Sequence, residues 1–331
     1  MRVLAAVDKF RGTASAHDLT RAIADACWTT GHECTEMPMA DGGEGTLAAL
    51  GGANQTLQVQ GPLGAPVNAE WRLHRGTAVI EMALSSGLQL VGGAEHNDPI
   101  AASTIGTGQL IDAALNHGIN RLIVCLGGSA TTDGGLGAVN AITTPTRLKR
   151  VEFLVACDVE TRFLDAAEVF AEQKGATATH IRFLTTRLAG TAEHYRQRFD
   201  VDVTAIDGGG AAGGLAGGLH ALGATLLPGF EIVADEVGLH EAIDACDVVI
   251  TGEGRLDDTS FAGKVVGGVA ALARAKKLRS IAICGEITAS ARKHATRERL
   301  EVFSLLDEFG AEALTRTSWC MTQLVERLLR D

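Results

Sequence analysis

The sequence predicts an α/β fold, in which a second α/β domain is inserted into a discontinuous, Rossmann-like doubly wound domain. Short apolar runs typical of buried parallel strands lie near both ends of the 331-residue chain, each leading into a glycine-containing loop and a helical segment. The middle of the chain instead alternates apolar and polar residues, as antiparallel strands do. We therefore expect one domain from 1–58 and 236–331, and an inserted domain over 59–235.

The N-terminal segment has the order strand, loop, helix, strand. The first strand is expected over residues 2–7, RVLAAV. A helix follows Ser15, which forms a capping-box pattern with Asp18, and it stops at Gly31. The run HECTEMPM, residues 32–39, is the second expected strand. This order is the beginning of a doubly wound sheet.

The same order of strand, loop, helix and strand returns near the C-terminus. The residues between these two parts have a different pattern of apolar and polar side chains. A strand leads into a glycine loop over 244–257, a helix covers 263–278, and RSIAICGE at 279–286 is another strand. In the centre, residues 56–83 alternate around GPLG and RG turns and predict antiparallel strands. A helix and a buried strand, GTGQLIDAALNHG and INRLIVCLGGSA, complete residues 106–130.

Composition excludes several classes of function. The net charge of −11 argues against nucleic acid or an anionic membrane as a partner. The seven cysteines form no CxxC pair, so we expect reduced thiols and no thiolate metal site. The N-terminus lacks a signal-peptide pattern, and no apolar run reaches membrane-spanning length. We expect a soluble, cytoplasmic protein, and the sequence leaves open whether it forms a homo-oligomer.

Four loops combine acidic residues with glycines: MADGGEGT at 39–46, TTDGGLG at 131–137, DGGGAAGG at 207–214 and TGEGRLD at 251–257. Glycines let backbone N–H groups approach a phosphate, whereas carboxylates beside a phosphate need a divalent cation between them. Together they indicate phosphoryl transfer with Mg²⁺. The same residues could instead be turns and helix caps. The carboxylates expected to act in catalysis are Asp8, Asp41 and Asp133, and those expected to bind metal are Glu253 and Asp257.

Phosphate binding requires backbone N–H groups and cations at loops that follow strands. Lys264 follows Gly263 at a helix start, where an anion would lie. No P-loop motif and no GxSxG occurs. A literal GxGxxG with Glu231 and Asp235 downstream keeps a dinucleotide-dependent oxidoreductase as an alternative. The expected cofactor-binding residues are Gly127, Gly128, Ser129, Gly208, Gly210, Gly213, Gly254 and Lys264.

Ten motifs together resemble the bacterial glycerate kinase family, in its order and spacing, from Met1 to about Gly285. They are DKFRGTASA, MADGGEGT, VQGPLGAPV, AVIEMALSSGL, STIGTGQLI, GGSATTDGG, ACDV, EQKGA, GAAGGL and ITGEGRLDDTSFAGK. The resemblance implies ATP-dependent phosphorylation of D-glycerate with Mg²⁺. It also implies two α/β domains, the second inserted in the first, with the active site in the cleft between them. The substrate-binding candidates are Arg11, as a clamp on the carboxylate, together with Asp158 and Lys174.

The chain departs from the family pattern beside these loops. Asp8-Lys9-Phe10-Arg11-Gly12 stands where the family has Asp-Ser-Phe-Lys-Gly, and Thr161-Arg162-Phe163 where it usually has Asn-Pro-Leu. The segments after Gly135 and Glu286 are shorter. These departures keep open a catalytically weakened homologue that only binds a nucleotide or metabolite. Which carboxylate is the base also stays open, and the family resemblance favours 2-phosphoglycerate as the product.

Overall fold

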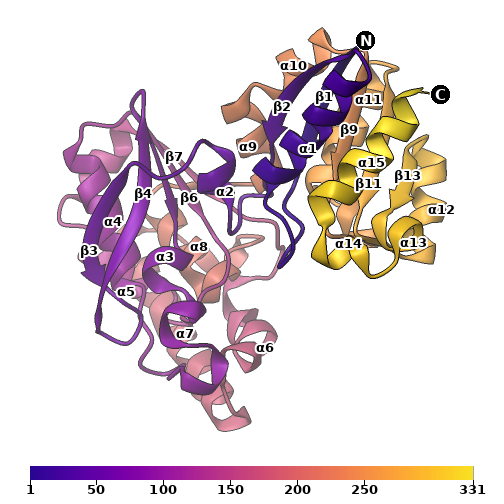
Figure 1. The fold of residues 1–331 in the computed structure, drawn as a ribbon. Helices are drawn as coiled ribbons and strands as arrows, with labels where there is room; N and C mark the ends of the chain where they lie inside the picture. The colour runs from indigo at the N-terminus through magenta and orange to yellow at the C-terminus, as the bar shows by residue number, and fades with distance from the viewer. Residues whose placement is uncertain (331) are drawn as a thin grey trace. The chain divides into compact units, whose positions relative to one another are not determined.

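The computed structural model describes residues 1–330, which form two compact units that each contain a sheet and its helices (Figure 1). Unit 1 consists of residues 1–41, 48–50 and the described chain from 230 onward. Unit 2 consists of 42–47 and 51–229. The α/β class with one unit interrupting the other is the class that the sequence predicts.

The expected boundaries at 58 and 236 differ from these limits for two reasons. Strand β3 (Gln55–Gln60) pairs along its whole length with a strand of unit 2, so residues 55–58 belong to unit 2. Helix α9 (Gly229–Val237) buries Phe230 and Val233 in a core of unit 1, so that unit begins at 230.

The sheet of unit 1 is parallel throughout, with the strand order β13-β11-β9-β1-β2. Its strands are β1 (Arg2–Val7), β2 (Glu33–Pro38), β9 (Val248–Gly252), β11 (Arg279–Cys284) and β13 (Glu301–Ser304). Both termini of the sequence therefore contribute to one sheet. Because parallel strands present their carboxyl ends at the same edge, the loops after β1 and β9 lie together.

Both faces of this sheet are buried. Alternate residues of β1 enter different cores: Val3, Ala5 and Val7 pack with α1 and α15, whereas Leu4 and Ala6 pack with α9, α10 and α11. Helices on both faces define the doubly wound arrangement. The helices are α1 (Ala16–Thr29), α10 (Leu239–Ala245), α11 (Val265–Ala275), α12 (Ala289–Glu298), α13 (Leu305–Phe309), α14 (Glu312–Thr315) and α15 (Thr317–Arg330).

Local signals in the sequence set the ends of several elements. The predicted capping box is confirmed, since Ser15 accepts the Asp18 N–H at 3.1 Å and Asp18 accepts the Ser15 N–H in return. The short parallel pair β10 (Arg255–Leu256) and β12 (Glu286–Ile287) continues the edge beyond β9 and β11.

The sheet of unit 2 is mixed, with the strands in chain order from β3 to β8. β3, β4 and β5 are antiparallel, as the alternating pattern of residues 56–83 predicts, and β5 to β8 are parallel. The strands after β3 are β4 (Pro66–His74), β5 (Thr77–Glu81), β6 (Arg121–Cys125), β7 (Glu152–Ala156) and β8 (Thr225–Leu227).

Helices of unit 2 pack on its sheet and on one another. α4 and α8 bury Leu110, Ile111 and Leu215 against β5 and β6, while α7 forms a separate core around Leu184, Leu188 and Tyr195. The helices are α2 (Thr46–Ala49, whose last two residues fall in unit 1), α3 (Ala83–Ser86), α4 (Ile105–Asn116), α5 (Leu136–Ala141), α6 (Ala166–Phe170), α7 (Ala178–Phe199) and α8 (Ala211–Ala221).

The glycine run before and within α8 serves close chain packing. Ala212, Gly213 and Gly214 have positive φ, which kinks the first turn. A Cβ at Gly213 would lie 2.0 Å from the Thr131 carbonyl oxygen, so only glycine fits. The 3₁₀ turn Val203–Ala205 precedes this run, whereas the dinucleotide fingerprint requires a strand there. The alternative interpretation as a dinucleotide site lacks that context.

Two further expectations concern the thiols and the membrane. All seven cysteines are free. Across residues 1–330, every helix is too short or too polar to cross a lipid bilayer.

Candidate active site

The candidate residues fall into two groups, one in each unit. In unit 1, Asp8 follows β1 and Glu253 follows β9, and these strands pair in register with Val7 opposite Gly252. The Asp8 N–H donates to the Gly252 carbonyl at 2.9 Å, which fixes the two loops side by side. A Cβ at Gly252 would stand 2.1 Å from the Ile283 carbonyl oxygen, so this turn also requires glycine.

Asp8 has the properties of a carboxylate that can exchange a proton near neutral pH. Burial, and then the charge of Asp41, raise its pKa from 3.8 to about 6. The Lys9 N–H, which donates to Asp8 Oδ1 at 2.7 Å, and the charges of Lys9 and Lys264 oppose this shift. The structure thus brings together two of the three predicted catalytic carboxylates, Asp8 and Asp41.

Glu253 is the second carboxyl group with a strongly shifted pKa. Burial raises its pKa from 4.5 to about 7, with smaller contributions from Asp8 and Asp257. Ser260 and Lys264 act in the opposite direction. Its Oε1 atom is buried and has no hydrogen-bond partner among residues 1–330. An unpartnered, buried carboxylate oxygen is costly and is typical of a site for an ion.

Lys264 and Asp257 flank this pair. Lys264 is the N-cap residue of α11, and its charge lowers the pKa of Asp8, Glu253 and Asp257. Asp257 Oδ1 accepts the N–H of Thr259 at 2.9 Å and its hydroxyl at 2.6 Å, so that oxygen caps the 3₁₀ turn Asp258–Phe261. Of the two predicted metal ligands, Glu253 has a vacant oxygen, whereas one Asp257 oxygen is occupied.

Arg11 and Gly254 lie on the same side of unit 1. A Cβ at Gly254 would be 3.4 Å from the Arg11 nitrogen, so the 253–255 loop passes close over the backbone of residues 10 and 11. The Arg11 side chain is exposed and makes no ion pair within residues 1–330. It is therefore available for an anionic ligand.

In unit 2, loop 127–135 follows β6 and has an exposed and a buried half. Gly127 and Gly128 are partly or well exposed, whereas Ala130, Thr131 and Thr132 are fully buried. A Cβ on Gly127 would lie 3.4 Å from the Gly43 Cα, so part of the MADGGEGT loop borders the exposed half. Residues 42–47 are tied to β5 because Glu81 Oε1 accepts the Leu47 N–H at 2.7 Å.

Asp133 lies in the buried half and its carboxylate is surrounded by donors. Oδ2 accepts the Thr104 N–H and hydroxyl at 2.9 and 2.8 Å and the Gly137 N–H at 3.2 Å. Oδ1 accepts the Gly135 N–H at 3.1 Å. This arrangement anchors the loop to the start of α4, and its predicted role as a base stays a prediction.

Lys174 and Asp158 lie at the other two substrate-binding positions that the sequence predicts. Lys174 is 3% exposed, and its Nζ donates to the Thr131 carbonyl at 2.7 Å. Burial lowers its pKa from 10.5 to about 7, while the charge of Asp133 acts in the opposite direction. Asp158 is exposed, and its Oδ1 accepts the Gly229 N–H at 2.8 Å. Direct contact of either with a substrate stays a prediction.

Sequence reasoning missed three residues that bind this loop. Asn97 Nδ2 donates to the Ala130 carbonyl at 3.0 Å, Arg187 to the Thr132 carbonyl at 2.6 Å, and the Tyr195 hydroxyl to the Gly134 carbonyl at 2.8 Å. One signal was present: Arg187 falls in the apolar stripe of α7, between Leu184 and Leu188, where a charge is unexpected.

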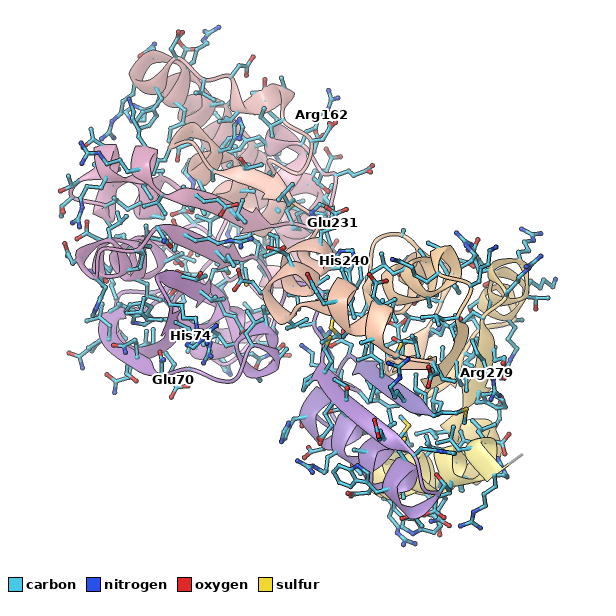
Figure 2. The ribbon with its side chains drawn as sticks, turned by 90° about the horizontal axis from the view of Figure 1, so that it is seen from above. Glu70, His74, Arg162, Glu231, His240 and Arg279 are labelled. Carbon is cyan, nitrogen blue, oxygen red and sulfur yellow. The ribbon has the colours of Figure 1, made fainter. Side chains whose placement is uncertain are left out.

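The altered Thr161-Arg162-Phe163 motif serves two different purposes. Phe163 is fully buried in the core around α7. Arg162 lies on the surface and its Nε is 3.3 Å from Asp207 Oδ1, with both side chains largely exposed. Figure 2 shows Arg162 at the periphery of unit 2. The motif therefore combines a core residue with a solvent-exposed ion pair of small energetic value.

The fold is that of a two-unit α/β protein with acid-and-glycine loops at the carboxyl ends of parallel strands, the edge at which such folds bind ligands. The glycerate kinase family model matches residues 3–145 and 142–331. The chain belongs to the glycerate kinase family, and its enzymatic class is that of a kinase.

Individual relatives agree with this assignment. Glycerate 2-kinase of Escherichia coli K12 is 37% identical over 94% of this chain and 92% of its own length. Glycerate kinase of Bacillus subtilis 168 is 34% identical over 100% and 96%. The crystal structure of a Salmonella typhimurium LT2 protein named for glycerate kinase 2 matches with a TM-score of 0.85 and 34% identity, covering 100% of this chain and 97% of that one.

Proposed function

We propose that this chain transfers the γ-phosphoryl group of ATP to D-glycerate and forms 2-phosphoglycerate. The observation that carries the proposal is the group in unit 1, where Asp8 and Glu253 have pKa values raised to about 6 and about 7 beside Lys264. Phosphoryl transfer to a hydroxyl group needs a base that is ionised near neutral pH, a cation for the phosphates and carboxylates for a divalent metal. The choice of glycerate as the substrate rests on the relatives named for glycerate kinase.

Asp8 is our choice of base. Its carboxylate is half-buried at the end of β1, and a pKa of about 6 leaves it mostly ionised at neutral pH yet basic enough to accept a proton. Asp133 is a weaker choice because donors already occupy both of its oxygens. Asp41 supports Asp8, since its negative charge raises the basicity of that carboxylate.

The donors in unit 1 fit Mg²⁺. Glu253 Oε1 is a buried oxygen without a partner among residues 1–330, and the charge of Asp8 contributes to the raised pKa of Glu253. Mg²⁺ is usually held by one or two carboxylates together with substrate phosphates. Bound Mg²⁺ would neutralise charge on the transferred phosphoryl group.

We assign phosphate binding to Lys264 in unit 1 and to Gly127, Gly128 and Ser129 in unit 2, where Gly127 and Gly128 are at least partly exposed and Ser129 is 7% exposed. Lys264 caps α11, where the helix dipole favours an anion. Arg11 is assigned to the carboxylate of D-glycerate, because a guanidinium can bind both carboxylate oxygens at once. Arg11 stands where the family pattern has lysine. The change keeps the positive charge and adds a planar guanidinium with several N–H donors.

A coupled assay with D-glycerate, ATP and Mg²⁺ tests the proposal. Turnover by the folded protein supports it, and absence of turnover in a protein with a cooperative thermal transition contradicts it. Phosphorus NMR of the product identifies the hydroxyl group. A doublet, from one neighbouring proton, means C2, whereas a triplet means C3 and refutes the 2-phosphoglycerate assignment alone.

A further inference from the structure

The buried half of loop 127–135 is held by side chains from distant parts of unit 2. Consecutive carbonyls of Ala130, Thr131 and Thr132 accept from Asn97, Lys174 and Arg187, which are 33, 43 and 55 residues away in the sequence. Each donor comes from a different segment. Side chains outside the loop therefore fix the orientation of three consecutive carbonyl groups within it.

Two of these donors are cations that the fold holds at a cost. Lys174 is 3% exposed and its Nζ binds a neutral carbonyl, and burial lowers the pKa of both Lys174 and Arg187. Removing a charge from water is unfavourable unless it is fully compensated. The hydroxyls of Thr131 and Thr132 and the Arg187 Nε are also buried without partners among residues 1–330. A loop selected only for stability would use apolar side chains here.

The geometry connects this costly network to the exposed half of the loop. Arg187 also donates to the Ile100 carbonyl at 2.6 Å, so it ties Thr132 to the segment that leads into α4. Trans peptide groups are planar, so fixing consecutive carbonyls restricts the backbone path of the residues before them. The chain that leaves β6 reaches the fixed residues through Leu126, Gly127, Gly128 and Ser129, and the Leu88 N–H also donates to the Gly128 carbonyl at 2.8 Å.

We propose that Lys174 and Arg187 are positioning residues, which hold Thr131 and Thr132 and thereby orient Gly127–Ser129 toward the phosphates of the nucleotide. This inference rests on the proposed function. It assigns Lys174 no contact with D-glycerate. The two cations act through the carbonyls that they bind, and the residues they orient make the contact with ATP.

Lys174→Met is the decisive variant, because methionine has a similar volume but neither charge nor donor. We expect the KM for ATP to rise about tenfold or more, with the KM for D-glycerate within about twofold of the wild type. The midpoint of thermal unfolding should change little, because the gain from removing a buried ammonium is offset by the Thr131 carbonyl that loses its donor. A purely structural role would instead lower stability and leave both KM values unchanged. Lys149→Met, at an exposed lysine of the same unit, is the matched control.

Arg187→Lys provides an independent measurement if Lys174→Met does not fold. A lysine can reach only one of the two carbonyls, so we expect the KM for ATP to lie between those of the wild type and Arg187→Met. Arg182→Met, at an exposed position of the same helix, controls for loss of a charge on α7.

Unchanged kinetics in Lys174→Met, or a selective rise in the KM for D-glycerate, would overturn the inference. An inactive wild-type protein would overturn the proposed function instead, so the two failures are distinguishable.

Discussion

Asp133 Oδ2 accepts hydrogen bonds from both the backbone N–H and the hydroxyl of Thr104, at 2.9 and 2.8 Å, and so joins the loop after β6 to the start of α4. An asparagine at this position presents an N–H₂ group to one set of donors and leaves them unsatisfied. We expect Asp133→Asn to lower the free energy of unfolding by about 2–4 kcal/mol. Urea unfolding measures it. Asp202→Asn, at an exposed cap of a 3₁₀ turn, should cost less than about 1 kcal/mol.

A loss of turnover in Asp133→Asn with unchanged stability would contradict this anchoring role and favour Asp133 as the base. The two measurements together therefore decide between the two functions of this carboxylate.

Asp8 should give the acid limb of the pH–rate profile. Its carboxylate is active when ionised, and its pKa is about 6, so kcat/KM should fall as the pH drops below about 6. Asp8→Asn should lower kcat by roughly 10²-fold or more and remove this limb. Asp25→Asn, on the exposed face of α1, serves as the control. A normal pH profile in Asp8→Asn would move the role of base to another residue.

Glu253 should make the protein less stable as the pH rises. Its pKa is raised from 4.5 to about 7, so the folded state favours the protonated form. The stability contributed by that proton is present below about pH 4.5 and is lost as the pH rises through about 7. Glutamine resembles the protonated form. Glu253→Gln should therefore match the wild type near pH 4 and be more stable by on the order of 1–3 kcal/mol near pH 8.

Magnesium provides a second measurement on the same residue. Added Mg²⁺ should raise the unfolding midpoint of the wild type near pH 8 more than that of Glu253→Gln. Glu286→Gln, at an exposed position on the neighbouring edge strand β12, should respond to Mg²⁺ like the wild type. Equal responses of wild type and Glu253→Gln would remove Glu253 from the metal ligands.

Lys264 should matter for ATP and for the carboxyl groups around it. Its charge lowers the pKa of Asp8 and Glu253, so Lys264→Met should move the acid limb of the rate profile to higher pH. The KM for ATP should rise roughly tenfold. Lys293→Met, at an exposed lysine of α12, is the control. If the acid limb does not shift in Lys264→Met, the charge of Lys264 does not affect the carboxylate that acts as the base.

The sequence predicted those parts of the fold that depend on neighbours along the chain. Strands β1, β6 and β9 are continuous apolar runs, and the Ser15–Asp18 capping box needs only three residues of spacing. The kink at Ala212–Gly214 was not predictable, because its cause is the approach of Thr131 from another segment. The domain boundaries were displaced for the same reason, since the pairing of β3 decides one and the packing of α9 in a core of unit 1 decides the other.

The candidate site divides in the same way. Asp8, Glu253 and Lys264 were recognisable because each directly follows a strand or precedes a helix, in a loop that contains glycine. Asn97 and Tyr195 were not, because their bonds go to backbone carbonyls that carry no signature in the sequence.

The central position of β1 has a consequence for synthesis on the ribosome. β1 lies between β2 and β9, and the Arg2 N–H donates to Asp247 across 245 residues of chain. β1 is therefore translated long before its neighbour β9, which follows all of unit 2 in the sequence. Contacts this distant form slowly, and the edge of β1 that faces β9 stays unpaired and prone to aggregate in the meantime. Unit 2 can complete its own sheet during that interval. A nascent chain halted before β9 would therefore have a folded unit 2 and an incomplete unit 1.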